Sequence, residues 1–165
     1  MKAVLFTVVV MVTCVFSQDN DKHYLQLEKL RGSIADHKAD ILQFASTITL
    51  DIDISGTILL AKEAEIITCE LRSAASQLYL IEAIDINNGN SIKKITHVKT
   101  ELTIIKEDLN SAHMRTINIC LGALDYQFVQ IVGSDLKKDI RKGEELLGKI
   151  IFEMDSLLNK VNTLH

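Results

Sequence analysis

Residues 60–81, with the sequence LAKEAEIITCELRSAASQLYLI, decide the fold class of this chain. Apolar residues with that helical spacing lie on one face of an α-helix, and a face of this length must be buried against other helices. The residues recur at alternating steps of four and three, in the series Leu60, Ala64, Ile67, Leu71, Ala74, Leu78 and Ile81. The stretch therefore predicts one long helix of a helical bundle.

The same spacing recurs in three other segments, and the composition agrees with it. The three series are Leu27, Leu30, Ile34, His37, Ile41, Phe44 and Ile48; Ile95, Val98, Leu102, Ile105, Leu109 and Ala112; and Leu136, Ile140, Gly143, Leu147, Ile150, Met154, Leu157 and Val161. The 165 residues include no Pro and only seven Gly, whereas sandwiches, barrels and disordered chains depend on both for their turns. We therefore predict an all-α, antiparallel helical bundle.

Polar segments between these series predict where the helices end. Residues 51–56 contain capping residues and a Gly, which predicts a turn. Residues 85–91 read DINNGNS, which predicts a loop with Ser91 as the N-cap of the next helix. Residues 133–135, Gly-Ser-Asp, are expected to end one helix and cap another. Residues 110–112 are ambiguous, because the apolar spacing continues through Asn110 and Ser111.

The cysteines bear on that ambiguous segment. Cys69 and Cys120 remain once a leader containing Cys14 is removed, and an even pair in an oxidising compartment predicts one disulfide. A continuous helix through residues 110–112 would leave the two thiols about 20 Å apart along the bundle, but a reversal there reduces this to roughly 6 Å. We therefore expect five helices, with four long helices as the alternative.

Two further segments affect the domain organisation. Residues 1–17 have a positive start at Lys2, a short apolar run, and Val15 and Ser17 placed for cleavage, which predicts a secretory signal peptide. Residues 18–165 then form a single, secreted helical domain with no transmembrane segment. Residues 47–54 alternate as a β-strand would, but because a lone strand has no partner in this chain, we interpret them as the end of the first helix.

The sequence offers no catalytic or cofactor site. The net charge of −4 argues against a nucleic-acid partner. Residues 51–56 resemble the opening of a calcium loop, but the twelfth position is Lys62 where a carboxylate is required. The histidines show no metal-binding spacing; we expect His37 to be a hydrogen-bonded core residue and the others to be surface residues. We find no nucleophile motif or phosphate-binding loop, so we predict a non-enzymatic protein without metal or cofactor.

The order of motifs resembles a known family. An Ile/Leu-rich helix at residues 30–48 precedes the segment GTILLAKEAEII from Gly56, a polar loop, a third helix with Ile92, Ile95, Val98 and Leu102, and a helix with Phe128 and Ile131. This order resembles the fungal hydrophobic surface-binding protein A family, which is related to secreted cell-wall galactomannoproteins. The resemblance covers roughly residues 25–160, although this chain lacks the Pro that often opens the third helix. It implies a secreted five-helix bundle that binds hydrophobic surfaces or fatty acids between its helices.

Two functions follow as hypotheses. Small residues alternate with Ile and Leu in the apolar series, and small residues facing large ones can leave a cavity between helices for an apolar ligand. We expect its lining to be Ile67, Leu71, Leu78, Leu102, Ile105 and Phe128. Alternatively, one amphipathic helix adsorbs to a lipid or hydrophobic surface. The second hypothesis is a secreted effector, venom or salivary-type protein that binds a host or partner protein.

Overall fold

The computed structural model describes the backbone of residues 2–47, 51–82 and 90–164. Side chains are described for residues 20–47, 55–81, 90–159 and 162. The described backbone forms four helices, α1 (Lys2–Ala45), α2 (Asp51–Glu82), α3 (Ser91–Gly122) and α4 (Gln127–Leu164), and contains no strand. The all-α prediction is confirmed. The expectation of five helices is wrong, because the described backbone forms four.

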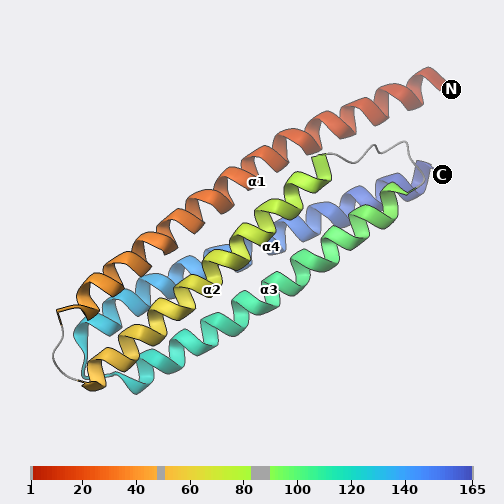
Figure 1. Ribbon diagram of the computed structural model, residues 1–165. Coiled ribbons are helices and arrows are strands. Elements are labelled where there is room, and N and C mark those ends of the chain that lie inside the picture. The colour runs from red at the N-terminus through yellow and green to blue at the C-terminus, as the bar shows by residue number, and fades with distance from the viewer. Residues whose placement is uncertain (1, 48–50, 83–89, 165) are drawn as a thin grey trace.

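The four helices form an antiparallel bundle in which each helix runs opposite to the one before it (Figure 1). α2 packs against α1 and α3, while α4 packs against α3 and α1. α2 and α4 also touch across the middle of the bundle. Both chain ends lie at the same end of the bundle, and α1 continues past the end of α2 (Figure 1). This is the up-down-up-down topology that short connections favour.

The core consists of the apolar series that the sequence predicts. Leu27, Leu71, Leu102 and Leu147 are fully buried, and the other described apolar members of the four series are buried except Phe44, which is half-buried and stacks on Phe128. His37 is half-buried rather than buried. The side chains of Ile48 and Val161 lie outside the described residues. Burial of each apolar series against the neighbouring helices stabilises these long helices, because intrinsic helix propensity contributes little by itself.

The expected reversal at residues 110–112 does not occur, and α3 passes through it without a break. Asn110 and Ser111 are exposed, whereas the flanking Leu109 and Ala112 are buried. The two polar residues therefore lie on the solvent face of a continuous helix, where they do not interrupt the buried face. The chain turns only after Gly122, at residues 123–126.

The predicted disulfide is also wrong, because Cys69 and Cys120 are both free. Cys69 is exposed on α2, while Cys120 is buried. Since Gly133 lies beside both Cys120 and Leu60, Cys120 is at the level of Leu60. Nine residues of helical rise separate Leu60 from Cys69, about 14 Å. That distance is too long for a disulfide bond, so the assumption behind the five-helix expectation does not hold.

Residues 133–135 do not end a helix, because they lie inside α4. A Cβ atom at Gly133 would overlap the sulfur of Cys120. The glycine therefore allows α4 to approach α3 closely, which is a packing requirement and not a turn. From the sequence the two roles look alike, since both favour Gly.

The predicted boundaries near residues 47–56 and 91 shift in the structure. α1 ends at Ala45, and α2 already begins at Asp51, so the expected turn at 51–56 is helix. Residues 51–54 belong to α2 rather than to the end of the first helix, and residues 48–50 lie outside the described residues. The N-cap of α3 is Asn90, one residue before the predicted Ser91.

The N-terminal segment continues the first helix. Residues 2–17 are helical and form the start of α1. In the part of the chain that the structure describes, no helix has both the length and the apolar character needed to cross a membrane. The leader at residues 1–17 stays a prediction, as does the division into a leader and one domain.

Candidate functional site

The contact between α1 and α4, which we call the α1–α4 seam, contains several buried polar residues. Toward its N-terminus, α1 continues its buried series with Asn20 and His23, which are only 3% and 2% exposed. α4 contributes Asp139, 5% exposed, to the same seam. Buried polar groups of this kind require partners, because an unpaired one costs desolvation free energy.

Asp139 is the centre of one polar cluster on the seam. Ser33 Oγ donates a hydrogen bond to Asp139 Oδ2 at 2.6 Å, which joins α1 to α4. Lys142 Nζ donates to Asp139 Oδ1 at 2.6 Å, and His37 Nε2 lies 3.3 Å from Asp139 Oδ2. Burial by itself would raise the pKa of Asp139, but the hydrogen bonds from Lys142 and Ser33 and the nearby positive charge hold it below its ordinary value.

A second polar cluster lies on the same seam, more than two turns of helix from the Asp139 cluster. His23 Nε2 lies 2.7 Å from Glu153 Oε2, and Lys149 Nζ lies 3.8 Å from Glu153 Oε1. Among the described residues, neither His23 Nδ1 nor Asn20 Nδ2 has a hydrogen-bond partner, although both atoms are buried. Each of these nitrogen atoms has the capacity for at least one hydrogen bond more than the described residues supply.

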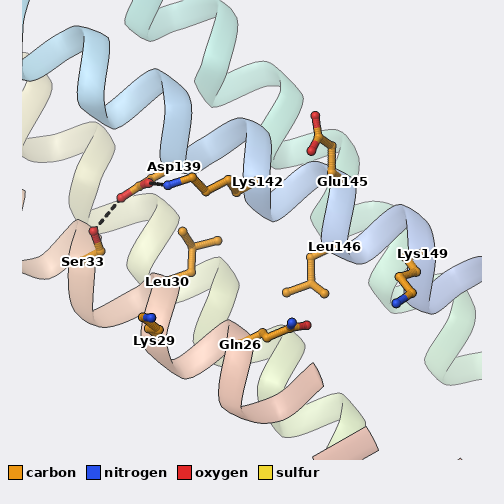
Figure 2. Close-up of a pocket in the computed structure, with 9 residues that line it drawn as sticks. All are labelled: Gln26, Lys29, Leu30, Ser33, Asp139, Lys142, Glu145, Leu146 and Lys149. Carbon is orange, nitrogen blue, oxygen red and sulfur yellow. Dashed lines mark hydrogen bonds and ion pairs between the residues drawn. The ribbon is translucent and has the colours of Figure 1, made fainter. Parts of the chain in front are cut away.

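Between the two clusters lies a groove of about 540 Å³ (Figure 2). This α1–α4 groove is lined by Gln26, Lys29, Leu30, Ser33, Asp139, Lys142, Glu145, Leu146 and Lys149. Leu30 and Leu146 extend from α1 and α4 into the space between the two helices, whereas the Glu145 carboxylate points away from α1 (Figure 2). The volume falls within the range of small-molecule sites.

The charges around the groove favour an anion. Lys29, Lys142 and Lys149 outnumber the acidic groups Asp139 and Glu145. Lys142 is engaged by Asp139, and the hydrogen bond to that carboxylate and its charge raise the pKa of Lys142. No ion pair of Lys29 occurs among the described residues. Lys29 is therefore the cation most available to a ligand that lies on Leu30 and Leu146.

The residues predicted to line a cavity lie elsewhere. Five of them are at most 5% exposed and belong to the packed core: Ile67, Leu71, Leu78, Leu102 and Ile105. Phe128 is half-buried, and its ring stacks on Phe44 with 3.5 Å between centroids. None of the six lines the α1–α4 groove. Their role in a lipid cavity stays a prediction.

The core around one of these residues is tightly packed. A Cβ atom placed on Gly143 would lie 3.5 Å from Leu71, 3.3 Å from Leu30 and 3.1 Å from Leu109. Side chains that close leave little free space beside Gly143. The groove at the α1–α4 seam is therefore the better candidate for a ligand site.

Sequence reasoning missed the polar seam, although one pattern pointed to it. His23 lies four residues before Leu27, so the heptad spacing places it on the buried face, yet the sequence interpretation assigned it to the surface. The expectation that His37 is a core residue with a polar partner is nearer to its position beside Asp139. Asp139, Lys142 and Lys149 carry no local motif, and only tertiary packing brings them opposite α1.

The described residues contain no group of three side chains able to hold a metal ion. By its fold the chain is a four-helix bundle, a class that hosts many unrelated functions. Comparison with known protein families, with curated proteins and with solved structures gives no match to this chain.

Proposed function

We propose that this protein is a secreted, non-enzymatic helical bundle that binds an amphipathic, lipid-like ligand. The observation that carries the proposal is the α1–α4 groove, with its apolar floor and cationic rim. An acyl chain would cover Leu30 and Leu146, and an anionic head group would lie near Lys29. The support for secretion is the predicted leader at residues 1–17.

The position of the groove favours reversible binding. It lies at a seam where polar contacts, such as Ser33 to Asp139, join the two helices. Separating such contacts exposes groups that water can solvate, whereas separating the other helices would expose core residues such as Leu71 and Leu102. A ligand that widens the α1–α4 seam therefore costs less than one that enters the middle of the core.

Native mass spectrometry tests the proposal on protein secreted from a eukaryotic host, before and after organic extraction. An added mass of the size of a lipid, lost on extraction and restored by adding a long-chain fatty acid, is the expected result. A protein without bound ligand that fails to take up any fatty acid or lysophospholipid would contradict it.

Two variants locate the site. Leu146→Trp fills the α1–α4 groove, and Lys29→Glu reverses the charge at its rim; each should weaken the binding of a fluorescent anionic fatty acid by about tenfold or more. The matched controls are Leu124→Trp, at an exposed site in the α3–α4 turn, and Lys138→Glu, on the outer side of α4. Equal binding by all four variants would exclude the groove.

A second candidate function is the binding of a partner protein. The observation in its favour is the apolar end of the bundle at the α3–α4 turn, where Leu121, Leu124 and Ile131 are 59%, 68% and 54% exposed. Exposed apolar side chains that lie together often mark an interaction site. Substituting all three with Ser should then abolish partner binding and leave lipid uptake unchanged.

A further inference from the structure

The outer face of α2 carries a second heptad series that the bundle does not bury. The exposed residues Ile58, Lys62, Glu65, Cys69, Arg72, Ser76 and Tyr79 follow one another at steps of four and three. This is the spacing by which a helix packs along a second helix. We call the exposed residues of α2 from Ile58 to Leu80 the α2 outer face.

The α2 outer face is apolar toward both of its ends. Ile58 and Leu59 are 41% and 48% exposed at one end, and Tyr79 and Leu80 are 67% and 54% exposed at the other. A helix that is apolar on its solvent side as well as on its core side usually has a further partner.

We infer that the α2 outer face binds the same face of a second copy of this chain, antiparallel, with the two-fold axis at Cys69. The exposed positions are spaced symmetrically about Cys69, so a second copy turned around this axis places Leu80 opposite Ile58 and Tyr79 opposite Leu59. Apolar residues thus meet apolar residues at both ends. A two-fold interface needs such self-complementarity.

Charge selects the antiparallel orientation. Glu65 of one copy then lies opposite Ser73 of the other copy and next to its Arg72. The two-fold axis repeats this contact with the two copies exchanged. A parallel pair would instead place Glu65 against Glu65 and Arg72 against Arg72, which is repulsive. The Glu65 side chain is 61% exposed although it also lies 3.4 Å from Lys38, so it remains accessible to the second copy.

Shape complements the apolar ends. A groove of about 380 Å³ lies between α1 and α2, with Tyr24 on one wall and Tyr79 and Leu80 on the other. In the antiparallel pair, Ile58 and Leu59 of the second copy come to this groove, and the contact occurs twice by symmetry. The α1–α4 groove lies at a different seam of the bundle, so the inference does not depend on the proposed function.

Sedimentation velocity over a wide concentration series measures the association of the full chain. We expect a concentration-dependent dimer whose dissociation constant rises about tenfold or more in Leu59→Lys and in Leu80→Lys. Phe152→Lys, at a 74% exposed site on α4, is the matched control and should leave the dimer unchanged. A chain that is monomeric throughout, or a dimer that Phe152→Lys weakens equally, overturns the inference.

Charge reversal tests the orientation and does not depend on apolar burial. Glu65→Arg and Arg72→Glu should each weaken the dimer, and the double variant should restore it; absence of restoration contradicts the antiparallel pairing. Circular dichroism confirms that each variant keeps its helical content, so that loss of the dimer is not loss of folding.

Crosslinking tests the register with a short bis-maleimide. In a Cys14→Ser background the reagent should join Cys69 to Cys69. With Cys69 also replaced by Ser, Leu59→Cys protein should crosslink to Tyr79→Cys protein but not to itself, because residues 59 of the two copies would lie about 30 Å apart. Crosslinking of Leu59→Cys to itself would show a parallel pair and overturn the inference.

Discussion

At the scale of single residues, two glycines on different helices have opposite roles. Gly133 is required because α4 lies so close to α3 that a Cβ atom would overlap Cys120 Sγ. Gly32 lies in α1, and a Cβ atom there would meet nothing within 4 Å. One glycine is therefore set by packing, whereas the other only lowers the stability of its helix.

Replacing each glycine with Ala separates these roles. Gly133→Ala should lower the free energy of unfolding by about 1–3 kcal/mol because it overpacks the α3–α4 contact. Gly32→Ala should instead raise it by roughly 0.5–1 kcal/mol through helix propensity. Urea unfolding monitored by circular dichroism measures both, and the double variant Gly133→Ala/Cys120→Ala should recover much of the loss. If the second substitution gives no recovery, the clash is not with the sulfur.

Asp139 gives the α1–α4 seam a pH dependence. Its pKa is lowered in the folded state, so ionised Asp139 contributes stability above its unfolded pKa of about 3.9, and that contribution is lost as the pH falls through the lower folded value. The free energy of unfolding, measured with urea, should therefore fall less steeply for Asp139→Asn than for the wild type as the pH is lowered from neutral into the acid range. Parallel pH profiles of the two proteins would contradict this assignment.

At the scale of the elements, the continuity of α3 determines the fold. A turn at residues 110–112 would divide α3 into two shorter helices, whereas the continuous α3 keeps its buried face from Ile95 to Cys120 in one line. Asn110 and Ser111 are tolerated because they face solvent. In the sequence, Asn110 and Ser111 are thus consistent with a turn and with a continuous helix. The burial of Leu109 and Ala112 on either side decides for the helix.

Proline substitution distinguishes a helix interior from a helix start. Ser111→Pro should cost about 3 kcal/mol of unfolding free energy, since it removes a backbone hydrogen bond inside α3 and clashes with the preceding turn. Gln127→Pro, at the first residue of α4, should be nearly neutral because that position suits Pro. Thermal unfolding compares the two, and a tolerated Ser111→Pro would restore the five-helix interpretation.

At the scale of the whole molecule, the bundle is held by packing rather than by a crosslink. Cys120 is buried and its thiol pKa is raised, mainly by burial, while Cys69 is exposed. The apolar series of four helices meet in one core, and the groove opens at the α1–α4 seam. The core and the candidate site therefore adjoin, and Leu30 belongs to both.

Thiol chemistry checks this arrangement in a Cys14→Ser background. At concentrations low enough for the monomer, the native protein should react rapidly at one thiol, Cys69, and at a second only in denaturant, since burial shields Cys120 and disfavours its thiolate. The melting temperature should be the same with and without reductant. A lower melting temperature in reductant would show that a disulfide stabilises the protein after all.

The sequence by itself determined the helical class and the core residues, because burial on one face of a helix imposes a spacing that can be read locally. It did not determine the number of helices, because Asn110 and Ser111 are compatible with a turn and also with the solvent face of a continuous helix. Nor did it place Gly133 against Cys120 or Asp139 opposite Ser33. Those contacts join residues far apart in sequence, and only the packing of α4 on α1 and α3 brought them together.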